Sequence, residues 1–136
     1  MASELKILLV DDFEMVRIGL RAALADLGFT HVEEADSGQT AMDMLNDGES
    51  KNNPYSIVLC DWVMPGVNGL EVLRFCRKHP VYKYVPFVML TAEAEQSSVV
   101  EAFQEGVTEY WVKPIAPDVL ERKLGKLIAN MKPRSA

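Results

Sequence analysis

The sequence has few of the features that mark secreted, disulfide-bonded or membrane-spanning proteins. It holds only two cysteines, Cys60 and Cys76, each within an apolar pattern that suits a reduced protein better than a disulfide framework. No apolar run approaches the roughly 18–20 residues that a membrane helix needs, and the N-terminus lacks a signal-peptide profile. We therefore expect a cytoplasmic protein with no membrane contact.

Positive charge and glycine-rich phosphate loops are also scarce. Lys and Arg number 14 against 20 Asp and Glu, which gives a formal net charge of −6. This balance disfavours sequence-independent binding to nucleic acid. The motifs G-x-G-x-x-G and G-x-x-x-x-G-K-[ST] do not occur, which argues against a nucleotide-binding protein.

The length and composition are those of one ordinary globular domain. The chain has 136 residues, of which 49% are hydrophobic and 25% charged, and a domain takes about 150 residues. We expect a single monomeric domain over residues 1–136, with a core from about residue 5 to residue 130 and a frayed tail over 132–136. This leaves no space for a separate output domain.

Five short apolar runs alternate with longer segments of helical periodicity. The runs predict strands over Ile7–Val10, Val32–Ala35, Ser56–Cys60, Phe87–Leu90 and Glu109–Val112. Continuous rather than alternating apolar residues are typical of strands that are covered on both faces. Five strand–helix units in a row predict an α/β fold, with a doubly wound parallel sheet and helices on both faces.

Several details of packing follow from the pattern. Helix boundaries are expected at Gly28, Ser37 and Pro117, and residues 47–54 are expected to form a loop. The fourth helix is expected to place three apolar residues on its inner face: Val99, Val100 and Phe103. Two more expectations concern single side chains: Trp111 fills the core, and His79 is an exposed bystander.

Polar side chains follow four of the five predicted strands. They are Asp11 and Asp12 after the first strand, Asp61 after the third, Thr91 after the fourth and Lys113 after the fifth. The second strand ends in the less distinctive Glu33-Glu34-Ala35-Asp36. Since open parallel sheets bind ligands at the carboxyl ends of their strands, we expect the five residues to converge there.

Three converging carboxylates repel one another, and burying them without a partner is costly. Lys113 supplies only one positive charge, so we expect a hard divalent cation such as Mg²⁺ beside it. That assembly favours a phosphoryl group, and a carboxylate can itself attack phosphorus to form an acyl phosphate. Any one of these residues could equally be a solvated strand-end residue, but five of compatible chemistry are poorly explained in that way.

Four motifs occur in order along the chain. They are Val10-Asp11-Asp12-Phe13, Asp61-Trp62-Val63-Met64-Pro65 with Gly69 downstream, Thr91-Ala92-Glu93-Ala94, and Tyr110 three residues before Lys113-Pro114. In these motifs the chain resembles the receiver domain of two-component response regulators and, within that family, the single-domain chemotaxis regulators (CheY-like). The resemblance implies a three-layer, flavodoxin-like (CheY-like) fold with strand order 2-1-3-4-5.

The resemblance also implies roles for the strand-end residues. Asp61 would accept a phosphoryl group from a histidine kinase. Asp12, Asp61 and the backbone carbonyl of Val63 would ligate Mg²⁺, and Asp11 would act through a coordinated water. Lys113 would bind the phosphoryl oxygens and, in the resting state, hold Asp12 or Asp61.

Signalling in this family would run from the site to a binding surface. Thr91 would move toward the phosphoryl group and let Tyr110 turn inward, which would alter the face made by the fourth helix, fifth strand and fifth helix. Implied partners are a CheA-like histidine kinase and either a FliM-like flagellar motor switch protein or a phosphatase. A stand-alone phosphate sink or relay remains the alternative within this interpretation.

Two features depart from the family pattern. Val63 replaces a polar side chain, and with Glu93 it occupies a position expected to tune dephosphorylation, so we hypothesise a longer-lived acyl phosphate. The fourth helix begins with Glu95-Gln96, so the output surface is less basic. A Mg²⁺-dependent phosphohydrolase with Asp61 as nucleophile is disfavoured, because such enzymes typically carry a second Asp where Val63 stands. We therefore expect a protein that is not an enzyme beyond its own phosphotransfer and dephosphorylation.

Overall fold

The computed structural model describes residues 4–92 and 96–131 of the chain. Its elements are β1 (Lys6–Val10), α1 (Glu14–Asp26), β2 (His31–Ala35), α2 (Gly38–Ser50), β3 (Ile57–Cys60), α3 (Gly69–Lys78), β4 (Phe87–Thr91), α4 (Gln96–Gln104), β5 (Glu109–Val112) and α5 (Pro117–Ala129). The strands pair in parallel in the order β2-β1-β3-β4-β5. Both the fold class and the strand order predicted from the sequence are confirmed.

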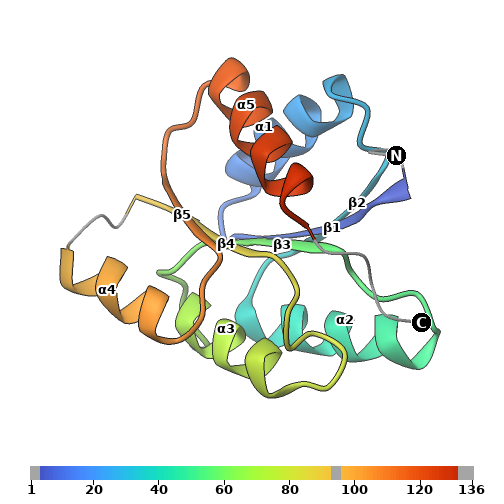
Figure 1. Ribbon diagram of the computed structural model, residues 1–136, viewed down its shortest axis with the longest axis vertical. Coiled ribbons are helices and arrows are strands. Elements are labelled where there is room, and N and C mark those ends of the chain that lie inside the picture. Colours follow the sequence, from blue (N-terminus) through green and yellow to red (C-terminus); the bar gives the residue numbers. More distant parts are fainter. Residues whose placement is uncertain (1–3, 93–95, 132–136) are drawn as a thin grey trace.

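Helices cover the sheet on both faces, as the uninterrupted apolar strands predict. α1 and α5 pack on one face, and α2, α3 and α4 on the other (Figure 1). Successive residues of a strand point to opposite faces, so Ile57 and Leu59 join the core beneath α1 and α5. Val58 and Cys60 join the core on the other face. No described helix is long and apolar enough to cross a membrane.

Local signals determine where several helices begin and end. Ser37 caps α2 by accepting a hydrogen bond from a backbone N–H of the first turn, and Asn68 and Glu71 form a reciprocal capping box on α3. Pro117 lies in the first turn of α5. Gly28 follows α1 with a φ of +95°, a conformation that favours glycine. The boundaries expected at Gly28, Ser37 and Pro117 are confirmed.

The prediction of a loop over residues 47–54 is wrong in part, because α2 continues to Ser50. Gly48, which resembles a turn signal in the sequence, lies inside the helix. A Cβ at this position would come within 3.0 Å of the backbone oxygen of Asn53. The glycine therefore allows the chain that returns from α2 to pass close against the helix.

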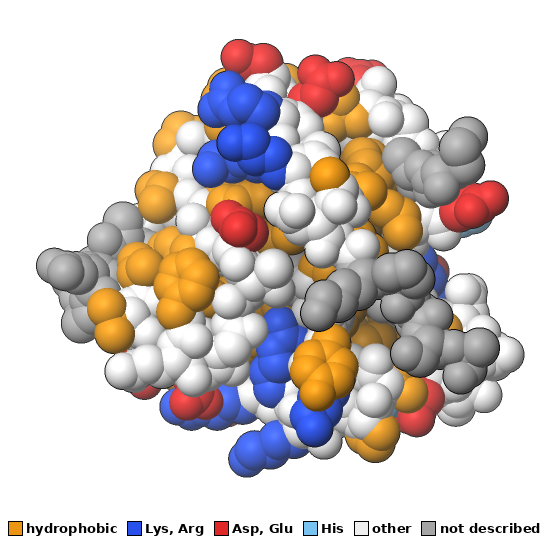
Figure 2. Space-filling view, viewed as in Figure 1, with side chains coloured by type: hydrophobic (Ala, Val, Ile, Leu, Met, Phe, Trp, Pro, Cys, Tyr) orange, Lys and Arg blue, Asp and Glu red, His pale blue; other side chains and the backbone are white. Residues whose placement is uncertain are grey.

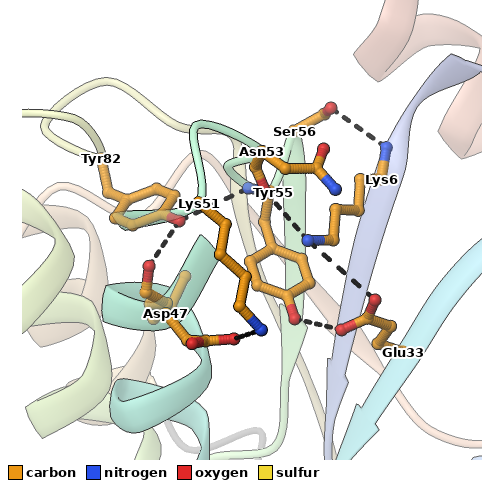
Figure 3. A network of polar contacts seen from close by, with 9 residues as sticks. Lys6, Glu33, Asp47, Lys51, Asn53, Tyr55, Ser56 and Tyr82 are labelled. Carbon is orange, nitrogen blue, oxygen red and sulfur yellow. Dashed lines mark hydrogen bonds and ion pairs between the residues drawn. The ribbon is translucent and has the colours of Figure 1, made fainter. Parts of the chain in front are cut away.

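The segment after α2 is fastened to the sheet by the polar network in Figure 3. Lys6 Nζ donates to the backbone oxygen of Asn53 at 2.8 Å and lies 4.2 Å from the ring centroid of Tyr55. The Tyr55 hydroxyl donates to the carboxylate of Glu33 on β2. Tyr82, which is fully buried, donates its hydroxyl to a backbone carbonyl of α2 at 2.7 Å. These contacts hold the amino-terminal edge of the sheet, opposite the edge where the strand-end acids lie.

The prediction that Val99, Val100 and Phe103 all lie on the inner face of α4 is wrong in part. Ala102 is fully buried and Val99 half-buried, whereas Val100 and Phe103 are 47% and 52% exposed. The small Ala102 side chain lies against the core, and the neighbouring stripe of larger residues turns toward solvent. In Figure 2 hydrophobic side chains gather on the surface around α4 and β5, so this face carries apolar area that the rest of the described chain leaves uncovered.

The expectation that His79 is an exposed bystander is also wrong. Its side chain is 9% exposed, and its ring centroid lies 4.9 Å from that of Tyr82. Nδ1 accepts a hydrogen bond from the backbone N–H of Val81, and Nε2 lies 3.2 Å from oxygens of both Asn46 and Glu49. His79 thus joins the end of α3 to α2. The sequence shows no such role, because the α2 partners Asn46 and Glu49 lie 33 and 30 residues away.

Trp111 behaves as expected of a core residue. It is 2% exposed on β5 and packs with Leu120, Leu124 and other residues of the core beneath α1 and α5. The Lys123 ammonium lies 6.0 Å from its ring centroid. The bulky ring therefore contributes to the packing of α5 on the sheet.

Candidate functional site

The carboxyl ends of β1, β3, β4 and β5 bring the predicted polar residues to one edge of the sheet. Asp11 and Asp61 are 3% and 6% exposed, and Thr91 is 1% exposed. The backbone N–H of Asp61 donates to Val10 at 2.8 Å, and that of Lys113 donates to Thr91 at 2.9 Å. Because the backbone ladder continues past the strand ends, the positions of these side chains follow directly from the sheet.

Three carboxylates meet at this edge. Oxygens of Asp11, Asp12 and Asp61 lie within 4.8 Å of one another. Lys113 Nζ lies 2.5 Å from Asp11 Oδ2 and 3.4 Å from Asp61 Oδ2. The resemblance named Asp12 or Asp61 as the resting partner of Lys113, and in the structure the nearer partner is Asp11. One ammonium faces three acids, so the cluster keeps an excess of negative charge.

Among the described residues, Asp12 is the member of the cluster whose carboxylate lacks a hydrogen bond or ion pair. Its Oδ1 is buried and has no hydrogen-bond partner among the described residues. A buried carboxylate oxygen without a partner is costly, and a divalent cation removes this cost. Three carboxylates with one oxygen unsatisfied are a donor set that fits Mg²⁺.

The loop between β3 and α3 follows Asp61 and is closed by Gly69. The Gly69 N–H donates to the backbone oxygen of Trp62 at 2.9 Å. A Cβ on Gly69 would lie 2.3 Å from the backbone oxygen of Asp61, so only glycine fits here without displacing the backbone. Trp62 is half-buried against the core, and the Val63 side chain is 60% exposed at the rim.

The residues expected to transmit a signal lie on β4 and β5. Thr91 ends β4 within the site, and Tyr110 is half-buried on β5, beside Met89 of β4 in the strand register. Glu93 and Glu95 lie outside the described residues, as does the expected tail over 132–136.

The nearby thiol is not a competing nucleophile. Burial, with a further contribution from the Asp61 carboxylate, raises the pKa of the Cys60 thiol well above its usual value. Cys60 is fully buried, and its Sγ donates to the backbone oxygen of Asp61. A protonated, buried thiol is inert, so Cys60 does not act as a nucleophile at this edge.

Two residues beside the site, Arg17 and Glu34, were not predicted from the sequence. The Arg17 guanidinium on α1 donates to the backbone oxygen of Asp11 at 2.6 Å and to Glu34 of β2 at 3.0 Å. Both contacts join residues of different elements. The available signal was weak: Arg17 and Arg21 are spaced at i and i+4 on the first helix, and an acid follows on the next strand.

The chain is similar to known proteins in sequence and in fold. A family model described as response regulator receiver domain matches residues 7–125. Chemotaxis protein CheY of Pseudomonas aeruginosa is 42% identical over 127 residues, which cover 93% of this chain and 98% of that protein. Chemotaxis protein CheY-3 of Vibrio cholerae is 40% identical over 127 residues, with coverage of 93% and 94%. The solved structure of chemotaxis protein CheY4 of Vibrio cholerae is similar with a TM-score of 0.80 and 29% identity, covering 90% of this chain and 98% of that one.

Proposed function

This chain belongs to the response regulator receiver family and is CheY-like, and from this premise we propose that Asp61 accepts a phosphoryl group from a histidine kinase. The observation that carries the proposal is the convergence of Asp61 with two further carboxylates and Lys113 at the carboxyl edge of the sheet. Phosphorylation then controls a non-covalent contact with another protein.

In the phosphotransfer step, a carboxylate oxygen of Asp61 attacks the phosphorus of a phosphohistidine. The new P–O bond forms as the P–N bond breaks, and the histidine leaves as the neutral base after taking up a proton. Lys113, 3.4 Å from Asp61 in the resting structure, is placed to bind the phosphoryl oxygens. Thr91 adds a hydroxyl donor from the neighbouring strand. Fixed positive charge and donors at the developing charge lower the barrier of such a transfer.

Asp12, Asp61 and the backbone carbonyl of Val63 would hold Mg²⁺, with Asp11 acting through a water. The unpartnered Asp12 oxygen supports this ligand set. When bound, the ion would neutralise carboxylate charge and polarise the phosphoryl oxygens.

The output surface is the face formed by α4, β5 and α5. Val100, Phe103 and Val112 are exposed by 47%, 52% and 49% there, and basic side chains lie over α5 (Figure 2). A phosphoryl group on Asp61 would draw Thr91 inward and let Tyr110 turn with it, which would reshape this face. Apolar area surrounded by charge is typical of a protein-binding surface.

The chain acts in the cytoplasm as part of a chemotaxis system. Its upstream partner is a CheA-like kinase, and its downstream partner is a FliM-like motor switch protein. The names of the two curated relatives support this assignment. To test it, the chain carrying beryllofluoride and Mg²⁺ is offered the N-terminal peptide of a motor switch protein. Binding that needs beryllofluoride is expected. Absence of binding at high concentration would favour a phosphate sink or relay, or a phosphatase partner.

The lifetime of the acyl phosphate depends on Val63. A polar side chain at this place can orient the attacking water, whereas valine cannot. Val63→Asn is therefore expected to speed the loss of phosphate from Asp61. An unchanged dephosphorylation rate would contradict this role.

Labelling by a small-molecule phosphodonor tests the phosphoacceptor. The wild-type chain should be labelled in the presence of Mg²⁺, and Asp61→Asn should not. Asp36→Asn is the matched control, because Asp36 is an exposed acid that follows β2 at the same edge of the sheet. Retained labelling of Asp61→Asn would overturn the site. Sustained release of phosphate from a phosphomonoester would instead indicate a phosphohydrolase.

A further inference from the structure

We infer that Arg17 is a positioning residue for the cation site: by holding the backbone of Asp11, it places Asp12 for Mg²⁺. The inference deepens the proposed function and rests on it. Arg17 lies on α1, outside the carboxylate cluster, and its side chain is 12% exposed. Its guanidinium joins three elements, because it donates from α1 to Asp11 at the end of β1 and to Glu34 on β2.

The polar atoms of Asp11 are all engaged in hydrogen bonds. Its N–H donates to Ala35 of β2 at 3.1 Å, and its backbone oxygen accepts from Arg17 at 2.6 Å. Its carboxylate oxygens accept from the Phe13 N–H at 2.9 Å and from Lys113 at 2.5 Å. Of these contacts, only the one from Arg17 reaches the carbonyl of the peptide bond that joins Asp11 to Asp12.

Within the described part of the chain, Asp12 has no comparable anchors. Its Oδ1 is buried without a hydrogen-bond partner among the described residues, so its own contacts do not hold it facing the other two carboxylates. The peptide bond between Asp11 and Asp12 holds Asp12 in this orientation, and Arg17 fixes the orientation of that peptide bond. Loss of a group that orients a metal ligand without touching the metal typically lowers metal affinity by roughly 10- to 100-fold.

The direction in which Mg²⁺ affinity changes when Arg17 is replaced separates positioning from simple electrostatics. Arg17 is a cation close to a site that would bind a cation. If its charge were all that mattered, its removal would strengthen Mg²⁺ binding. If its hydrogen bond to Asp11 positions the ligand, its removal weakens binding.

Arg21 provides a matched control. It lies one turn further along α1, carries the same charge and pairs with the same Glu34 at 2.9 Å. Its side chain is 51% exposed, and within the described part of the chain it makes no hydrogen bond or ion pair with Asp11. Arg21→Met therefore removes the same charge from the same helix and leaves the Asp11 contact intact.

The test is a Mg²⁺ titration followed by the fluorescence of Trp62, the residue after Asp61, together with labelling by a small phosphodonor. Arg17→Met should raise the dissociation constant for Mg²⁺ about 10-fold or more, whereas Arg21→Met should stay within about 2-fold or bind slightly more tightly. Arg17→Lys should restore part of the affinity, because an ammonium can still donate to the Asp11 oxygen. Labelling of Arg17→Met should recover at saturating Mg²⁺, since the chemistry at Asp61 is intact.

The outcomes separate the inference from the proposed function. If the wild-type chain neither binds Mg²⁺ nor is labelled, the proposed function fails, and this inference with it. If the wild-type chain does both, the inference is overturned by an Arg17→Met variant that binds Mg²⁺ as well as the wild-type chain or more tightly. If Arg17→Met does not fold, as circular dichroism would show, Arg17→Lys decides: a Mg²⁺ affinity equal to that of the wild-type chain overturns the inference, and a weaker one supports it.

Discussion

Replacement of Asp12 by Asn should make the Mg²⁺-free protein more stable. Oxygens of Asp11, Asp12 and Asp61 lie within 4.8 Å of one another. Lys113 pairs with Asp11 and Asp61 but not with Asp12. At an effective dielectric constant of about 20, two like charges 4.8 Å apart repel by about 3.5 kcal/mol. Asp12 is half-buried, so water screens part of this energy, and we expect a net gain of about 1–3 kcal/mol in the free energy of unfolding.

The assay is urea or thermal unfolding, with a chelator and again with saturating Mg²⁺. For a chain of this length, 1 kcal/mol corresponds to a melting shift of about 4 °C, so Asp12→Asn should melt about 4–12 °C higher in the chelator. Mg²⁺ at about 100 times its dissociation constant should stabilise the wild-type chain by about 2.7 kcal/mol. It should stabilise Asp12→Asn far less, because a ligand is lost.

The control for this prediction is Asp36→Asn, which makes the same charge change at an exposed position. It should alter stability by less than about 0.5 kcal/mol and leave the Mg²⁺ effect unchanged. The reasoning is refuted if Asp12→Asn is less stable than the wild-type chain without Mg²⁺, or if Mg²⁺ protects both equally.

Three further predictions concern the scaffold. Gly69→Ala should lower the urea midpoint, because a Cβ would lie 2.3 Å from the backbone oxygen of Asp61. Gly19→Ala, on an open face of α1, should instead raise the free energy of unfolding by about 0.5–1 kcal/mol. The opposite order of the two midpoints would contradict the packing at Gly69. Burial raises the pKa of the Cys60 thiol well above its usual value and that of Cys76 to about 12, so both thiols stay protonated at pH 8. They should react with a thiol reagent only after unfolding in urea, and prompt reaction of the native chain would refute this. Tyr82→Phe should lower the free energy of unfolding by about 0.5–1.5 kcal/mol, because the hydrogen bond from its buried hydroxyl to the Leu45 carbonyl of α2 is lost. Tyr84→Phe, at a residue 85% exposed, should be neutral in thermal unfolding, and equal effects would argue against the network.

The fold could be predicted from the sequence because three strands, β1, β3 and β4, are continuous apolar runs that each end at a polar residue. The run Ile57–Cys60, for example, is uninterrupted in its apolar character, and an acid ends it. A parallel sheet with both faces covered requires such runs. The same sheet brings all strand ends to one edge, so the convergence of Asp11, Asp61 and Lys113 follows from chain order alone.

What the sequence could not show are contacts between elements. His79 packs against α2 through Asn46 and Glu49, which lie 33 and 30 positions away, and periodicity carries no signal for that. The stripe of Val100 and Phe103 has helical spacing, but spacing does not tell which of two adjacent stripes faces the sheet; the small Ala102 decides it. Arg17 was missed for a related reason, since its hydrogen bond is to a backbone atom, which leaves no mark in the sequence.

The most direct test of the central claim is to locate the phosphoryl group. The wild-type chain is incubated with a small phosphodonor, with Mg²⁺ or with a chelator, and its peptides are mapped by mass spectrometry. We predict a single modification, on the peptide that contains Asp61, that forms with Mg²⁺ and is absent with the chelator. A modification on another residue, or one that forms equally well without Mg²⁺, would contradict the account.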